Sequence, residues 1–331
     1  MTRISTNQNT NMLLSQMAAN KTRVDKYSKE VSSGLKVSVP GDSIRAGEIS
    51  ALNDEIERID GYTKRIATSV GHLNFQDQIM EQASNVITRA REIAEQMANE
   101  SNSVEVRNTA AKEVWGLRSQ MVDLANSVYQ GRFIYGGADN DDPPFDQDVT
   151  TYTTGGSPES TTKYNFDNYD PPPAIASPPS RNVMVSDTQS VRISTPGDTI
   201  FSRAIAGIEK LGRALEGYRT DMVTPDYTAF NFPTEYNLQT REIAQSLDDL
   251  ETARSADIQP ERASLGERLN FLEATKSIHD FSKDAAKTQL SSLRDADAAE
   301  SATGLSLAQT ALQASYTVTS RVLNMSIMDY L

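Results

Sequence analysis

The last 31 residues, 301–331, form an almost uncharged stretch with a regular apolar repeat. Its only charged side chains are Arg321 and Asp329. A surface helix in water normally keeps a charged face opposite its apolar stripe, and this segment has almost none. It is also too polar to span a membrane. It is therefore predicted to be a helix that packs fully only among other chains. Small or apolar residues alternate in the steps of three and four that mark a coiled-coil seam, at Leu305, Ala308, Leu312, Ser315, Thr319 and Val322.

The other end of the chain has the same character. Residues 1–20 carry a single charge, Arg3. Two uncharged amphipathic ends on one chain are best explained as a pair, so the N- and C-terminal helices are predicted to run antiparallel. The alternative is two frayed helical tails without a role, because chain termini are often disordered. The N-terminal seam comprises Leu14, Met17, Val24, Val31 and Leu35, with Lys21 and Ser28 in two of its core positions.

Composition excludes several classes of function. The formal net charge of −13 argues against nucleic acid as the main partner, and no cluster of Lys and Arg offsets it. Without cysteine the chain has no disulfide, no thiol nucleophile and no thiolate metal site. No apolar run is long enough for a membrane span. The N-terminus lacks the basic and apolar regions of a secretory signal, so any export is expected to proceed without a cleaved signal peptide.

Between its two ends the chain follows a helical pattern with one interruption. Long segments hold the apolar rhythm of helices, with a break or kink expected near residues 258–260. From 138 to 198 this rhythm disappears, prolines accumulate, and the β-branched pieces 183–185 and 191–193 predict a small β-rich insertion. The expected class is mainly α with a β-rich insertion, an elongated antiparallel helical rod or coiled coil built from both chain ends, with the insertion at its tip.

Five segments follow from this pattern. Their predicted roles are the two halves of a terminal coiled coil (1–42 and 298–331), the two halves of a helical rod domain (43–137 and 199–297) and an inserted outer domain (138–198).

The sequence offers no active site. The two histidines, His72 and His279, are each isolated within helical patterns. The acidic residues 139–142 miss the template of a calcium-binding loop, and no phosphate-binding or nucleophile motif is present. We therefore predict no catalytic residue, no cofactor and no metal site, and a protein that is not an enzyme.

Several motifs resemble the flagellin superfamily, which comprises bacterial flagellin and the hook-associated proteins. Lys29-Glu-Val-Ser-Ser-Gly-Leu-Lys36 before a turn and a long helix resembles its N-terminal signature. The C-terminal half of the family is similar to 265–273, to 293–300 and to the closing helix around Gln309. The resemblance covers about 1–145 and 236–331. The members at the junction of hook and filament are most similar, through Gly131-Arg-Phe-Ile-Tyr-Gly-Gly137, Pro143-Pro-Phe145 and the opening Arg3-Ile-Ser-Thr6.

This resemblance implies a structural protein of the extracellular flagellum, exported unfolded without a cleaved signal. The implied partners are the preceding hook-associated protein, flagellin, further copies of the chain in a ring, and a flagellar export chaperone, but neither nucleic acid nor a membrane. The termini would be ordered by burial among neighbours on assembly. The expected assembly interface consists of Leu14, Met17, Val24, Val31, Leu35, Leu305, Ala308, Leu312 and Val322.

Two alternatives remain at this point. The first is flagellin itself, the filament subunit of the same superfamily. The second is a secreted surface-binding protein or adhesin that acts through the 138–198 insertion.

Overall fold

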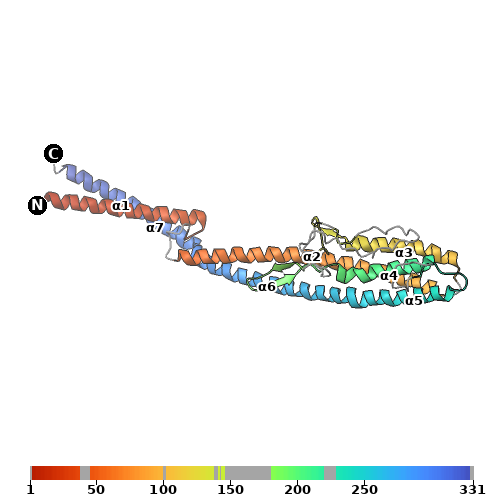
Figure 1. The fold of residues 1–331 in the computed structure, drawn as a ribbon. Coiled ribbons are helices and arrows are strands. Elements are labelled where there is room, and N and C mark those ends of the chain that lie inside the picture. Colours follow the sequence, from red (N-terminus) through yellow and green to blue (C-terminus); the bar gives the residue numbers. More distant parts are fainter. Residues whose placement is uncertain are drawn as a thin grey trace. The chain divides into compact units, whose positions relative to one another are not determined.

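The computed structural model describes residues 2–37, 45–99, 102–137, 141, 143–145, 180–219 and 229–328. Most of the predicted insertion, its acidic residues Asp139 and Asp142, and the side chain of Val322 lie outside this description. The mainly α class is confirmed (Figure 1). The helices are α1 (Thr2–Ser33), α2 (Ala46–Met97), α3 (Val104–Ala125), α4 (Asp198–Glu216), α5 (Tyr236–Thr252), α6 (Gln259–Arg294) and α7 (Ala298–Met328).

The chain divides into two compact units. The terminal unit comprises Met1–Gly61 and Ile278–Leu331, and the central unit comprises Tyr62–Ser277. Helices α2 and α6 contribute to both and pair antiparallel in each of them. In the terminal unit the ammonium group of Lys283 contacts the carboxylate of Asp60. In the central unit Arg262 Nε donates to Asp77 Oδ1 at 2.8 Å.

Local sequence signals explain where the helices start and change. Ser103 is the N-cap of α3, and its hydroxyl accepts a hydrogen bond from the Val106 amide. The expected interruption near residue 258 is a π-helical turn, Ala253–Ile258, between α5 and α6. Because Pro260 has no amide hydrogen, an α-helical bond is missing at this place, and a wider turn accommodates its loss. Helix therefore continues through the turn without a break.

Two short antiparallel hairpins lie in the central unit. The first pairs β1 (Val128–Tyr129) with β2 (Arg132–Phe133). The second pairs β3 (Asn182–Met184) with β4 (Ser190–Arg192), with Val183 opposite Val191, as the β-branched pieces predict.

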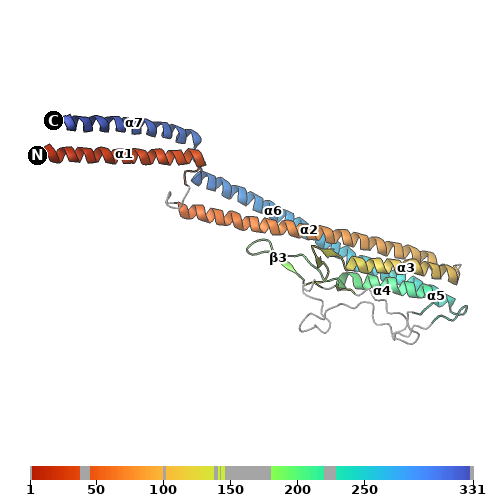
Figure 2. The same cartoon turned by 90° about the horizontal axis from the view of Figure 1, so that it is seen from above.

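The described part of the insertion lies beside the middle of α2 and not at a tip (Figure 2). Tyr62 donates to Asp187 at 2.6 Å, and Arg65 Nε donates to the carbonyl of Met184 at 3.0 Å. The predicted tip position is therefore wrong for these residues. The reason is that α3 runs back along α2, where Arg89 and Glu113 form an ion pair, so the chain reaches the hairpin midway along α2.

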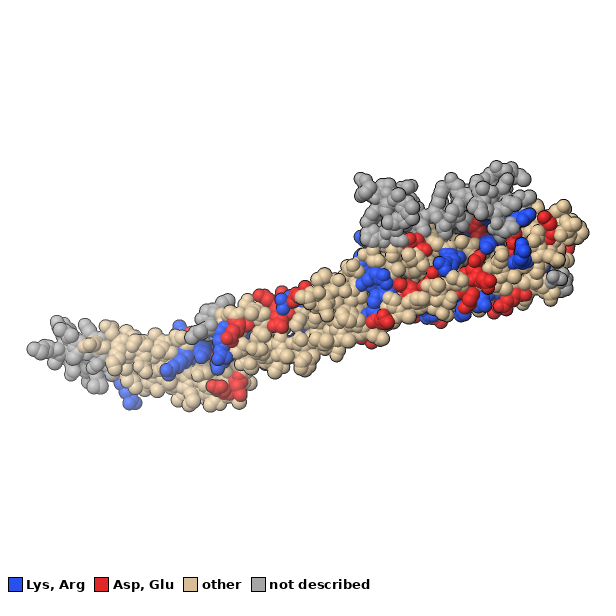
Figure 3. All heavy atoms as spheres, turned by 60° about the horizontal axis from the view of Figure 1, so that its bottom comes forward, with Lys and Arg blue, Asp and Glu red and all other residues tan. Residues whose placement is uncertain are grey.

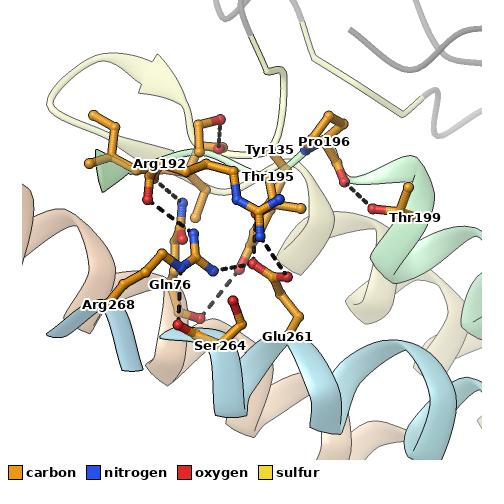
Figure 4. A network of polar contacts seen from close by, with 12 residues as sticks. Gln76, Tyr135, Arg192, Thr195, Pro196, Thr199, Glu261, Ser264 and Arg268 are labelled. Carbon is orange, nitrogen blue, oxygen red and sulfur yellow. Dashed lines mark hydrogen bonds and ion pairs between the residues drawn. The ribbon is translucent and has the colours of Figure 1, made fainter. Parts of the chain in front are cut away.

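A network of polar contacts fixes this hairpin to α2 and α6 (Figure 4). Gln76 Nε2 donates to the carbonyl of Ile193 at 3.0 Å, and Arg268 Nη1 donates to the carbonyl of Arg192 at 3.1 Å. The carboxylate of Glu261 accepts from Thr195 Oγ1 and pairs with Arg268. Because the network satisfies backbone carbonyls at the end of β4, the hairpin is anchored without a large sheet of its own.

A buried ionic group joins α3 to α4 in the core of the central unit. The carboxylate of Glu209 pairs with Arg118 at 3.3 Å and with Arg213, and all three side chains are at most 5 % exposed. Burial raises the pKa of Glu209 to about 7, and the charge of Arg118 opposes this shift. Burial also lowers the pKa of Arg213 to about 9. The ionised form of Glu209 is therefore stabilised by the charge of Arg118, against the effect of burial.

We expect Glu209→Ala to destabilise the central unit by about 3–5 kcal/mol, because it removes the carboxylate that two buried guanidinium groups share. Urea unfolding followed by circular dichroism measures this loss. Glu92→Ala is the matched control, since Glu92 and Arg89 form an exposed pair on α2, worth less than about 1 kcal/mol. Equal effects of the two substitutions would show that the buried group does not stabilise this core.

Candidate assembly interface

Helices α1 and α7 pair antiparallel and bring the two described chain ends together (Figures 1 and 2). Three contacts set their direction. Thr319 Oγ1 donates to Met17 Sδ at 3.2 Å, Asn20 Nδ2 donates to Ser315 Oγ at 2.7 Å, and Ser301 Oγ donates to Glu30 Oε2 at 3.0 Å. The predicted antiparallel packing of the chain ends is thus present within a single chain.

The fully buried positions of the seam between these helices are largely polar. Its buried positions include Asn20, Glu30, Ser301 and Thr319. A polar side chain in a helical seam stabilises less than leucine does, but it fixes register because it needs a specific partner. Asn20 and Glu30 have such partners in Ser315 and Ser301. The polar partners in the seam therefore specify one alignment of α1 and α7.

Close approach of the two helices depends on small residues in α7. A Cβ atom on Gly304 would lie 2.6 Å from the ring of Tyr27. One turn further on, Ala308 is also buried. Glycine costs about 1 kcal/mol of helix propensity relative to alanine, and here that cost is offset by room for an aromatic ring in the seam.

The structure places the predicted interface residues in three locations. Leu14 and Val31 lie outside the seam of the single chain, with 51 % and 46 % of their surface exposed. Asn20 and Tyr27 occupy the positions that the heptad pattern assigns to Lys21 and Ser28. The physical reason is that burying a lysine charge is costly, whereas the neutral amide of Asn20 has a partner. Leu35 is half-buried beyond the end of α1, opposite Asp295. The members within the seam, all buried or half-buried, are Met17, Val24, Leu305, Ala308 and Leu312.

Two of the family-like motifs meet where α1 ends and α7 begins. Gly34 has a φ of 69°, which only glycine adopts readily, and ends α1. Beyond it the amide of Lys36 donates to the carbonyl of Arg294 at 2.7 Å, and the amide of Ala296 donates to the carbonyl of Gly34 at 2.9 Å. Asp297 then caps α7 through the Ala299 amide. We call residues 34–37 and 294–297, with these bonds, the joint.

Comparison with known proteins shows that both chain ends match regions of one protein family. Residues 4–139 match the bacterial flagellin N-terminal helical region, and residues 247–331 match the bacterial flagellin C-terminal helical region. Together these regions make up about two thirds of the chain. The chain belongs to the flagellin superfamily. Its motifs at the joint are therefore flagellin-family features, and this family is one of structural flagellar proteins and not of enzymes.

Individual relatives are hook-associated proteins. The chain is 26% identical over 310 residues to flagellar hook-associated protein 3 of Escherichia coli (strain K12). The aligned region covers 88% of this chain and 87% of the relative. It is 25% identical to the protein of the same name from Salmonella typhimurium, with 92% of each covered. The solved structure of flagellar hook associated protein-3 from Legionella pneumophila shares the fold, with a TM-score of 0.59, 15% identity, and coverage of 74% of this chain and 98% of that one.

In this flagellin-family chain the exposed apolar side chains concentrate in the terminal unit. Among the described residues, eight of the thirteen large apolar side chains that are exposed lie there. On the face that Figure 3 presents, the charged side chains of the terminal helices gather near the joint, and most of the described surface farther along these helices is uncharged. Surfaces of this kind are typical of protein contacts. The eight residues, which we call the apolar set, are Met12, Leu14, Val31, Ile278, Phe281, Leu307, Tyr316 and Val318.

The sequence pattern missed several members of this site. Asn20, Tyr27 and Glu30 were not among the predicted seam residues, and Gly304 was passed over. A glycine inside a helical repeat is a signal of close packing that could have identified Gly304.

No described helix is long and apolar enough to cross a membrane.

The register of α1 against α7 can be tested with cysteine pairs, since the chain has no cysteine of its own. The double variant Asn20→Cys/Ser315→Cys should form an intramolecular disulfide on mild oxidation, because these side chains touch. Lys21→Cys/Ser315→Cys is the control and should not, since the next residue of a helix points about 100° away. Mass spectrometry of the oxidised free chain measures the disulfide yield of both variants. Equal yields would contradict the register.

Proposed function

We propose that this chain is a structural subunit of the bacterial flagellum that joins the hook-associated ring to the flagellin filament. The observation that carries the proposal is the pairing of the two chain ends through a seam with polar buried positions, while the apolar set of the terminal unit is left exposed. The names of the relatives, which match nearly the full chain, support the position at the hook. The role is mechanical and involves no catalysis.

Assembly would supply the burial that the single chain lacks. Each square ångström of apolar surface removed from water contributes about 25 cal/mol, so fully burying one leucine or phenylalanine contributes roughly 1.5–3 kcal/mol. This gain offsets the entropy lost when the terminal helices are ordered. The predicted interface residues keep this role in the proposal. Leu14 and Val31 would contact neighbouring subunits, and the others would hold the pair together.

The proposed neighbours are the preceding hook-associated protein, flagellin and further copies of the chain in a ring. A flagellar export chaperone would hold the termini before assembly, and export to the extracellular flagellum would proceed without a cleaved signal. In this proposal 1–42 and 298–331 form the terminal coiled coil, 43–137 and 199–297 the rod, and 138–198 the outer domain.

Electron microscopy of the purified chain, alone and with flagellin seeds or isolated hook ends, tests the proposal. We expect no filaments from the chain alone and decoration of hook or filament ends in the mixtures. Long filaments formed by the chain alone would instead identify it as flagellin. Soluble chains that bind neither end would remove the junction role.

We predict that Leu14→Asp abolishes end binding while the thermal unfolding of the free chain changes by less than about 0.5 kcal/mol. The reason is that Leu14 is exposed in the single chain and would be desolvated only in the assembly. Leu14→Met, which keeps apolar volume, should retain binding. Sedimentation with seeds and scanning calorimetry measure the two effects. Normal end binding by Leu14→Asp would exclude this residue from the interface.

A further inference from the structure

A cavity of about 490 Å³ lies in the central unit between α2 and the two hairpins. Its walls come from three separate stretches of chain. The lining residues are Lys64, Arg65, Thr68, Ser69 and His72 of α2, Tyr129, Gln130, Arg132, Phe133 and Ile134 at the first hairpin, and Arg181, Val183, Ile193 and Ser194 at the second. A volume of this size suits a small organic ligand.

The lining of this cavity is basic, although the whole chain carries a net charge of −13. Among the described residues four cations line it, Lys64, Arg65, Arg132 and Arg181, and no carboxylate does. The other walls are partly apolar, with Tyr129 among them. Such a combination fits a ligand that has both a negative group and an apolar body.

Arg181 lies in this cavity at an energetic cost. Its Nε atom is buried without a hydrogen-bond partner. Burial lowers the pKa of Arg181, and the nearby positive charge of Arg132 lowers it further. Both effects disfavour the charged guanidinium, and the negative charge of an anion between the two arginines would oppose both.

The turn beside Arg132 is a two-residue hairpin turn, Gln130-Gly131, with positive φ at both residues. Gln130 has a φ of 52°, in the left-handed region that side chains other than glycine rarely adopt. This turn joins the strands that carry Tyr129 and Arg132, and Gln130 itself lines the cavity. Tyr129 is held against the ring of His72 with centroids 5.6 Å apart.

We propose that this cavity binds an organic oxyanion, a carboxylate or phosphate attached to an apolar body, with Arg132 and Arg181 contacting the charged group. The apolar body would lie against Tyr129 and the neighbouring apolar wall. The site belongs to the central unit and is independent of the terminal helices.

The test uses 2-naphthyl phosphate and 2-naphthoate as probes, with uncharged 2-naphthol as the comparison. Isothermal titration calorimetry on the full chain should show both anions binding at least about tenfold more tightly than naphthol, since a hydrogen bond to a charged group is roughly twice as strong as a neutral one. The difference between the two anions distinguishes phosphate from carboxylate as the preferred group. Arg181→Gln and Arg132→Gln should each weaken anion binding about tenfold. Arg203→Gln, an exposed arginine paired with Asp257, is the control.

A second readout comes from the two histidines of the chain. Burial and the charge of Arg181 lower the pKa of His72 to about 4. A bound anion should raise that pKa, while the ring resonances of His279 stay unchanged in the same NMR titration. His279→Gln assigns the signals. Equal binding of naphthol and the anions, an equal loss in Arg203→Gln, or an unchanged His72 signal under saturating anion would overturn the proposal.

Discussion

The terminal unit depends on the backbone hydrogen bonds of the joint. There the chain leaves α1 through Gly34 and pairs with the residues that lead into α7. These bonds set where both helices start and stop, so they also set which side chains face each other along the seam. Because they use main-chain groups, they do not require apolar side chains. The seam beyond them can therefore be polar without losing its register.

A polar seam gives the terminal helices specificity with little stability. Asn20 and Glu30 have fixed partners in α7, and burying them costs free energy that only those hydrogen bonds recover. The apolar set remains available to other chains. This distribution suits a subunit that must stay soluble alone and become rigid in an assembly. A leucine-rich seam would bury more apolar surface between α1 and α7 themselves. Less apolar surface would then remain to be buried against neighbouring subunits.

The central unit follows a different principle. Its core holds buried charges, with Glu209 between two arginines, and a polar network anchors the second hairpin to α2 and α6. Ionic groups of this kind hold elements in one arrangement because any displacement leaves a charge unpaired. The same unit carries a cavity with four basic side chains and no carboxylate among its described lining residues. Opposite charges therefore meet in the core, whereas like charges gather at the cavity.

The sequence alone determined the mainly α class, the pairing of the two ends and most of the α7 seam, because apolar spacing of three and four is set by helix geometry. The family motifs were also visible, and their meeting at the joint explains Gly34 and Asp297. On α1 the prediction chose Lys21 and Ser28 where the structure uses Asn20 and Tyr27. Periodicity cannot decide between adjacent residues when a polar partner on another helix makes the choice.

Only the tertiary structure decided what depends on contacts between distant segments. It placed the described insertion beside the middle of α2, because α3 runs back along that helix. It brought Glu209 between Arg118 and Arg213, and it placed Arg132 near Arg181 from two separate hairpins. Each of these residues reads in the sequence as an ordinary solvated charge. Whether such a charge lies in the core or lines a cavity depends on its burial and on its neighbours. Both are set by the folding of the chain and not by the local sequence.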